Sequence, residues 1–261
     1  MKKVIYLSGG FGNQLFQMLA AIHLSNFKNR VFIDTTLVDP GFVPEKLLRW
    51  KVHGNFVTEI FENQFEFGRR SIILVAYDFT LLFLSKIFMV RLLSHKYFHT
   101  QEYKINKDVK INMGYFQNLE SYSSSEFKSY LGIFEKLIST KKLEDRTVIH
   151  FRGGDSLWAQ EYLLYYTKVF DIAQIDNIPI TIVTDDELYC KKLLQDYDFE
   201  YSIVSNNALV DFEFLSSSKT IFTAPSTFSW WAAILMNDKK KIYMPKFFQS
   251  RYKVSTNIIY L

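Results

Sequence analysis

The sequence predicts an α/β protein of two domains, each built on a parallel β-sheet. Three observations predict this class. Short apolar runs alternate with stretches of helical periodicity. The runs are continuously apolar, as in parallel strands covered on both faces, and glycine clusters directly follow two of them. The 261 residues suffice for one large or two small domains, because a domain averages about 150 residues.

The N-terminal part of the chain opens as a strand, a glycine loop, a helix and a second strand. These elements are expected at Val4–Leu7, Gly9–Gly12, Leu15–Leu24 and Val31–Asp34. This order is typical of the first unit of a doubly wound sheet. We therefore predict an N-terminal α/β domain over residues 1–141, with an irregular insertion at about 40–110.

The alternation becomes regular from residue 147 onward. Strands are expected at Thr147–Phe151, Ile180–Thr184, Tyr201–Val204, Thr220–Thr223 and Lys241–Met244. Helices are expected between them at Tyr162–Ile175, Glu187–Tyr197, Leu209–Ser217 and Ser229–Leu235. A spacing of about 20 to 30 residues per strand fits βα units, so residues 142–261 are predicted to form a Rossmann-like domain.

Charge and cysteine content exclude several classes of function. The chain has 31 Lys and Arg against 27 Asp and Glu, and a net charge of +4 is too small to indicate nucleic-acid binding. It suits a small anionic ligand. The single cysteine, Cys190, forms no disulfide within the chain, and no Cys/His spacing indicates structural zinc. The N-terminus lacks the pattern of a signal peptide, so we expect a cytoplasmic protein.

Residues 72–93 are long and apolar enough to raise the question of a membrane. Asp78, Lys86 and Arg91 interrupt the stretch, and each charge costs roughly 2.5 to 3.5 kcal/mol near the bilayer centre. We therefore expect a buried helix pair or the apolar contact of a subdomain. Peripheral contact of residues 72–99 with the inner face of a membrane stays open, because basic and aromatic residues follow the stretch.

The first glycine loop has two interpretations. Gly10 and Gly12 open a nicotinamide-cofactor fingerprint, and Asp34 ends the second strand where a ribose-binding acid is expected. Leu15 occupies the position of the third glycine, so the fingerprint is partial. The alternative is a tight strand-to-helix turn without a ligand.

The second loop carries charge as well as glycine. At the end of the predicted strand, His150 and Arg152 precede Gly153 and Gly154. A guanidinium fork and backbone amides can bind a diphosphate. Asp155 either holds Arg152 or takes part in proton transfer; the alternative is a purely structural Arg–Asp pair.

Three further segments offer polar groups at strand ends or helix starts. Asp185 and Asp186 suggest either a metal-binding pair or a strand end followed by a helix N-cap. Asp211 begins a helical run and would, in the simplest interpretation, cap it. Ser226 and Thr227 can cap the next helix while offering hydroxyls to a phosphate. The tryptophans at 230 and 231 are expected in the core.

Three segments of the chain also occur together in one known family. Residues 9–17 (GGFGNQLFQ) are similar to its GGxGNQxFQ segment, and residues 150–155 (HFRGGD) to its HxRRGD box. Residues 211–216 (DFEFLS) and 224–233 (APSTFSWWAA) are similar to its DxxLMS…NSSFSWWxAWL block. In these segments the chain resembles the bacterial α-1,2-fucosyltransferases, glycosyltransferase family 11.

The resemblance implies a fold and an activity. The fold is the GT-B arrangement, in which two Rossmann-like domains face a central cleft. The activity is inverting transfer of L-fucose from GDP-β-L-fucose to the 2-hydroxyl of a galactoside, in the synthesis of a surface polysaccharide such as O-antigen or capsule. No metal or other cofactor is expected. Whether the acceptor is lipid-linked stays open.

The resemblance also assigns residue roles. The donor-binding residues are predicted to be Gly10, Asn13, His150, Arg152, Asp185, Asp211, Ser226, Thr227 and Phe228. Arg152 would grip the β-phosphate, His150 would face the diphosphate and Asp211 would contact the guanine. Asn13 would face the donor from the opposite domain. The catalytic residues are predicted to be Arg152, Asp155 and Glu161, the two acids being candidate bases for the acceptor hydroxyl.

The chain departs from the family pattern at two places. Gly153 replaces the second arginine of the box, and Pro225 and Thr227 replace the usual Asn and second Ser. Negative charge still builds on the leaving diphosphate, and Arg152 with a helix N-terminus can stabilise it without a metal. Alternatives are transfer of another GDP-deoxyhexose such as GDP-colitose, non-catalytic binding of a GDP-sugar, and an NAD-dependent oxidoreductase.

Overall fold

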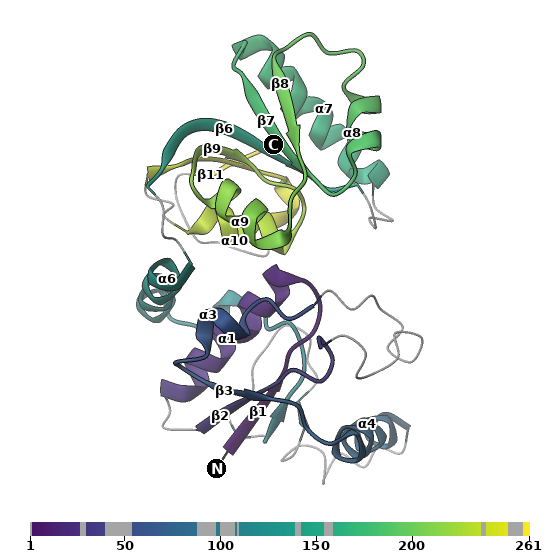
Figure 1. Ribbon diagram of the computed structural model, residues 1–261, viewed down its shortest axis with the longest axis vertical. Coiled ribbons are helices and arrows are strands. Elements are labelled where there is room, and N and C mark those ends of the chain that lie inside the picture. The colour runs from purple at the N-terminus through teal and green to yellow at the C-terminus, as the bar shows by residue number, and fades with distance from the viewer. Residues whose placement is uncertain are drawn as a thin grey trace. The chain divides into compact units, whose positions relative to one another are not determined.

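The computed structural model describes residues 2–26, 30–39, 54–87, 98–99, 108, 110–138, 142–153, 159–235, 239–249 and 258–261. The chain forms two compact units, Met1–Tyr130 and Leu131–Leu261. Each unit is built on one sheet in which every strand pair is parallel (Figure 1). The predicted α/β class with two parallel sheets is therefore confirmed. The boundary predicted from the sequence, between residues 141 and 142, lies just before the first strand of unit 2, and the central cleft stays a prediction.

Unit 1 has the strand order β3-β2-β1-β5-β4. Its elements are β1 (Lys2–Tyr6), α1 (Phe11–Asn26), β2 (Arg30–Asp34), α3 (Thr58–Phe61), β3 (Glu66–Gly68), α4 (Ile72–Ile87), β4 (Phe98–His99), β5 (Ile111–Asn112), the 3-10 turn Leu119–Ser121 and α6 (Ser124–Ile138), which continues into unit 2. The segment 40–110, expected to be irregular, thus contributes β3 and β4 to the sheet. Strands of two or three residues are too short to show a hydrophobic period, which is why the sequence did not reveal them.

Unit 2 has the strand order β11-β10-β9-β6-β7-β8. Its elements are β6 (Glu144–Phe151), α7 (Ala159–Asp176), β7 (Ile180–Thr184), α8 (Glu187–Leu193), β8 (Tyr201–Val204), α9 (Ala208–Ser216), β9 (Ser218–Phe222), α10 (Thr227–Ile234), β10 (Lys241–Met244), the 3-10 turn Lys246–Phe248 and β11 (Ile258–Tyr260). From β6 the chain first builds toward β8 and then returns to add β9 on the other side. This is the order of a doubly wound Rossmann sheet, so a switch point lies between β6 and β9.

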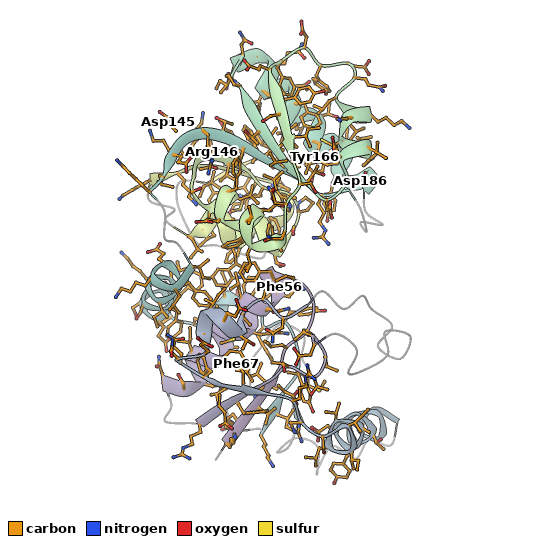
Figure 2. The ribbon with its side chains drawn as sticks, viewed as in Figure 1. Phe56, Phe67, Asp145, Arg146, Tyr166 and Asp186 are labelled. Atoms are coloured by element: carbon orange, nitrogen blue, oxygen red, sulfur yellow. The ribbon has the colours of Figure 1, made fainter. Side chains whose placement is uncertain are left out.

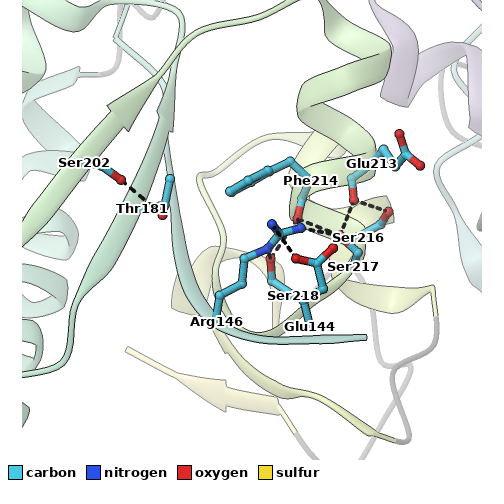
Figure 3. A network of polar contacts seen from close by, with 9 residues as sticks. All are labelled: Glu144, Arg146, Thr181, Ser202, Glu213, Phe214, Ser216, Ser217 and Ser218. Atoms are coloured by element: carbon cyan, nitrogen blue, oxygen red, sulfur yellow. Dashed lines mark hydrogen bonds and ion pairs between the residues drawn. The ribbon is translucent and has the colours of Figure 1, made fainter. Parts of the chain in front are cut away.

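The amino end of β6 is fixed to α9 by one arginine. The Arg146 guanidinium lies 3.6 Å from the centre of the Phe214 ring and donates to Ser217 Oγ at 2.6 Å and Ser218 Oγ at 3.0 Å (Figure 3). It also pairs with Glu144 at 3.0 Å. This network lies at the edge of the sheet opposite the carboxyl ends of the strands, so its role is to hold the scaffold.

The paired tryptophans belong to the core, as expected. Trp230 and Trp231 are fully buried, and the Trp231 ring stacks on Phe134 of α6 with centroids 4.9 Å apart. Together they fasten α10 to the body of unit 2.

The structure describes only the first part of the apolar stretch 72–93, so the expected buried helix pair or subdomain contact stays a prediction for the rest. The described part is α4, which buries Val75 and Asp78 but exposes Ile72, Ile73 and Tyr77. The remainder of the stretch, from residue 88, lies outside the described residues. Within the described part of the chain, no helix is long and apolar enough to cross a bilayer.

Candidate functional site

The carboxyl ends of β6 and β9 bring the second and third sequence motifs together. Ile149 of β6 pairs with Phe222 of β9, so the residues that follow each strand emerge side by side. His150 lies near the end of β6 and Arg152 directly follows this strand, whereas Ser226 follows β9 at the start of α10. Doubly wound sheets bind ligands at this kind of switch point.

His150 is buried and electrically neutral. Its side chain is 6% exposed, and its ring lies 5.4 Å from that of Phe228 on α10. Burial, together with the positive charge of Arg152, lowers the pKa of His150 to about 3. Its Nδ1 has no hydrogen-bond partner among the described residues. A buried polar atom left unpaired is costly, and such atoms commonly mark a place for a water or ligand group.

The backbone after β6 is held from two sides. The Arg152 N–H donates to Tyr166 Oη of α7 at 3.0 Å, and the Gly153 N–H donates to Asp185 Oδ1 at 3.0 Å. Tyr166 lies beside this turn in Figure 2. Both contacts fix the peptide units that carry the arginine, so the direction of its side chain is constrained by neighbouring elements.

The two acids after β7 have separate structural partners. Asp186 caps α8 by accepting the Tyr189 N–H at 3.0 Å, while Asp185 accepts from Gly153. The N-cap interpretation is therefore confirmed for Asp186. Across the described ranges, no three His, Cys, Asp or Glu side chains gather as metal ligands do. The metal-independent mechanism stays a prediction.

Close packing explains why position 153 lacks the arginine of the family box. A Cβ at Gly153 would lie 3.0 Å from Asp186 Cβ, 3.1 Å from the Tyr189 ring and 3.2 Å from the Phe151 ring. These distances are shorter than ordinary van der Waals contacts, so a larger residue at position 153 would require these neighbours to shift.

The helix that follows β9 begins at the switch point. Ser226 is its N-cap, and Ser226 Oγ accepts the Phe228 N–H at 3.3 Å. The first turn of an α-helix presents N–H groups and a partial positive charge to an anion. Phe228 packs between His150 and Phe212, so the same turn that carries Thr227 also covers the histidine.

Two consecutive tyrosines that no motif contains hold the switch point together. Tyr165 Oη donates to the carbonyl of Thr223 at 2.6 Å, directly after β9, and Tyr166 accepts from Arg152 after β6. Both tyrosines are buried on α7. A sequence of aromatic residues in a helix indicates core packing, so nothing in the sequence distinguished these two.

Asp211 does not cap α9. The N-cap is Asn207, whose side chain accepts from the N–H groups of Leu209 and Val210. Asp211 instead accepts from the Asn206 N–H at 3.2 Å and from Asn206 Nδ2 at 2.9 Å, and its burial raises the pKa of its carboxyl. It thus orders the loop before α9. Its guanine contact stays a prediction.

The structure does not describe the side chains of the two predicted catalytic acids, Asp155 and Glu161. Gly154 and Asp155 lie outside the described residues, and so does the side chain of Glu161, whose backbone belongs to α7. Their roles stay predictions.

The glycine loop of unit 1 is organised around buried glutamines. Gln17 accepts the Ser8 N–H at 3.0 Å and donates to the Gly114 carbonyl at 2.9 Å. Gln14 donates to the Gly54 carbonyl at 2.7 Å and accepts the Phe56 N–H at 3.1 Å. These side chains join three separate segments of backbone at the carboxyl end of β1.

Gly9, Gly10 and Asn13 complete this loop. Gly9 has a φ of 73°, and a Cβ there would lie 2.7 Å from Asn13 Nδ2, so only glycine fits. The Gly10 carbonyl accepts from the Asn13 and Gln14 N–H groups and opens α1. Asn13 Oδ1 accepts from Gln117 Nε2 at 3.0 Å. The predicted approach of Gly10 and Asn13 to a donor held by the other domain stays a prediction.

Asp34 is not placed to bind a ribose. The residue has no exposed surface, and its Oδ1 accepts the Thr36 N–H at 2.9 Å. Its other oxygen lies 4.0 Å from Arg70 Nε. The acid on which the nicotinamide interpretation depends is thus part of a buried network.

The sequence of the chain was compared with known proteins. No family model matches the chain. The chain is 26% identical over 264 residues to an alpha-1,2-colitosyltransferase of Escherichia coli, covering 90% of this chain and 87% of that protein. The chain is similar to a bacterial α-1,2-glycosyltransferase. This similarity confirms the resemblance that the three motifs carry.

Solved structures resemble the chain more weakly. The fucosyltransferase NodZ from Bradyrhizobium has 12% identity and a TM-score of 0.44, covering 90% of this chain and 93% of that one. The E. coli heptosyltransferase WaaC with ADP has 10% identity and a TM-score of 0.44, covering 100% and 92%. At these TM-scores the likeness carries no inference about ligand or mechanism.

Proposed function

We propose that this chain is an inverting glycosyltransferase that moves a deoxyhexose from a GDP-sugar to the 2-hydroxyl of a galactoside acceptor. The observation that carries the proposal is the meeting of His150, Arg152 and the start of α10 at one switch point. Similarity to an alpha-1,2-colitosyltransferase over 90% of the chain supports the same linkage type. The acceptor would belong to a surface polysaccharide, whose synthesis uses such linkages.

The proposed chemistry depends on charge at the leaving group. Breaking the bond between sugar and diphosphate leaves negative charge on the β-phosphate, and Arg152 with the N-terminus of α10 would stabilise it. Neutral His150 would donate a hydrogen bond without repelling the arginine. The acceptor hydroxyl would attack the opposite face of the sugar and lose its proton to a base, for which Asp155 and Glu161 stay the candidates.

Two donors fit this proposal. GDP-fucose is favoured by the motifs, and GDP-colitose by the identity of the bacterial relative. Colitose is fucose without its 3-hydroxyl. A pocket that hydrogen-bonds this hydroxyl would reject colitose strongly, whereas a pocket without such a group would accept both sugars.

The direct test is transfer in EDTA from each GDP-sugar to terminal galactosides, with the product linkage determined by NMR. We expect an α-1,2-linked product that is lost in Arg152→Ala. Lys219→Ala is the matched control, because Lys219 is an exposed cation at the other end of β9. Tight GDP binding without transfer to any galactoside would contradict the proposed transferase activity and favour a non-catalytic protein that binds a GDP-sugar.

A further inference from the structure

In the first turns of α4, where the structure describes the side chains, four apolar residues are exposed and the acid Asp78 is buried. Ile72, Ile73, Leu74 and Tyr77 are 55%, 77%, 48% and 54% exposed, whereas Asp78 is fully buried. A helix on the surface of a soluble domain normally does the reverse. We refer to these four exposed side chains as the α4 face.

A buried polar network fixes this orientation. Asp78 Oδ2 accepts from Tyr6 Oη at 2.7 Å and from Arg70, and Arg70 Nη1 also contacts Tyr6 Oη at 2.8 Å. Val75 packs beside Asp78 against the unit 1 sheet. Rotating α4 to bury its apolar face would remove Asp78 from these partners. The α4 face is therefore held outward by the same contacts that attach the helix to β1.

The charge of the surrounding sequence indicates what covers the face. Between residues 69 and 99 the only acid is Asp78, and it is paired with Arg70. The basic residues of this stretch are Arg69, Arg70, Lys86, Arg91 and Lys96. Arg69 pairs with Asp39. Three basic residues, Lys86, Arg91 and Lys96, follow the α4 face in the sequence, and the stretch holds no further acid.

An apolar helix face followed by basic residues fits an anionic lipid surface. We propose that α4 lies in the plane of such a surface, with the α4 face among the acyl chains, and that the excess positive charge of the stretch 69–99 attracts this part of the chain to anionic headgroups. A second copy of the chain fits less well. The stretch 69–99 has no acid other than Asp78, which is paired with Arg70, so a second copy would offer no acid from this stretch to the basic residues.

Vesicle sedimentation tests this surface. The wild-type chain should bind phosphatidylcholine vesicles that contain phosphatidylglycerol, bind phosphatidylcholine alone more weakly, and leave the anionic vesicles as salt rises. Ile73→Glu with Tyr77→Glu should weaken binding by about tenfold or more, because it removes apolar contact and adds two anions. Leu188→Glu is the matched control, since Leu188 is an 83% exposed apolar residue on α8.

Unchanged vesicle binding by the double variant would overturn the proposal. A wild-type protein that is dimeric on size-exclusion chromatography, with a monomeric double variant, would also overturn it, because the α4 face would then be a contact between two copies. Circular dichroism and GDP binding, measured on both variants, should match the wild type. Circular dichroism distinguishes a misfolded variant from a loss of lipid binding. GDP binding shows separately whether the proposed donor site is correct.

Discussion

The two glycine loops occupy equivalent places and are built for different tasks. One follows β1 and the other follows β6, each beside the point where its sheet changes direction. Around the loop of unit 1, buried Gln14 and Gln17 join backbone segments to one another. Around the loop of unit 2, a buried neutral histidine, an arginine and a helix N-terminus converge. The neighbouring side chains, rather than the glycines, therefore decide whether such a loop can bind an anion.

Of the changes that test this difference between the two loops, substitution of Arg152 should have the largest effect. Arg152→Ala should lower transfer about a hundredfold or more, because a charge-assisted contact to the leaving phosphate contributes several kcal/mol in a desolvated site. The melting temperature should stay at the wild-type value. Full activity in the variant, measured by steady-state kinetics beside Lys219→Ala, would refute the phosphate contact.

A substitution in the glycine loop of unit 1 is expected to lower the stability of the protein without a specific loss of nucleotide binding. Gln17→Leu leaves the Ser8 N–H and the Gly114 carbonyl without their partner, which should cost about 2 to 3 kcal/mol of unfolding free energy. Urea denaturation measures this. Gln195→Leu, at an exposed position, serves as the control and should change the free energy of unfolding by less than about 0.5 kcal/mol. Equal stability of Gln17→Leu and the wild type would contradict the structural role.

Acid should destabilise unit 2 through His150. Its pKa is about 3 in the folded chain and 6.5 as an ordinary histidine, so the unfolded chain binds the proton first and stability falls as pH drops below 6.5. The histidine should account for about 2 kcal/mol of lost stability near pH 5. His150→Asn should flatten the curve of stability against pH in this window. Parallel curves for the two proteins would show that the histidine is not buried in its neutral form.

The smallest effect is expected at Tyr166, which acts on the site only through the Arg152 backbone. Tyr166→Phe removes one hydrogen bond, so the KM for the GDP-sugar should rise severalfold, equivalent to about 1 kcal/mol, while kcat changes little. Tyr201→Phe, at a partly exposed position on β8, is the control. A fall in melting temperature with an unchanged KM would instead indicate a structural tyrosine.

Strong local patterns made most of unit 2 predictable. Continuous apolar runs placed β7 and β10 at their observed bounds, because most of their residues are buried. The bounds of β8 were also as predicted, although this edge strand is exposed or half-buried along its length. The family resemblance assigned His150, Arg152 and Ser226 to one site, and the structure brings the β6 and β9 ends that carry them to the same edge of the sheet.

Tertiary contacts account for what the sequence did not show. Tyr165 and Tyr166 are recognisable only from the backbone groups that they touch across the sheet. The expected cap at Asp211 was wrong because Asn207, another favoured N-cap residue, stands one turn earlier. The exposed face of α4 was missed because the buried partners of Asp78 come from Tyr6 and Arg70, which lie before the helix in the chain.

Calorimetric titration with nucleotides, in EDTA and without acceptor, tests the central claim most directly. The account predicts that GDP-fucose or GDP-colitose binds, that GDP competes, and that UDP and NAD bind far more weakly. It also predicts that Arg152→Ala loses this binding while Gln17→Leu, at a temperature where it is folded, keeps it. Selective binding of NAD, or equal GDP binding by wild type and Arg152→Ala, would contradict a donor site at the β6–β9 switch point.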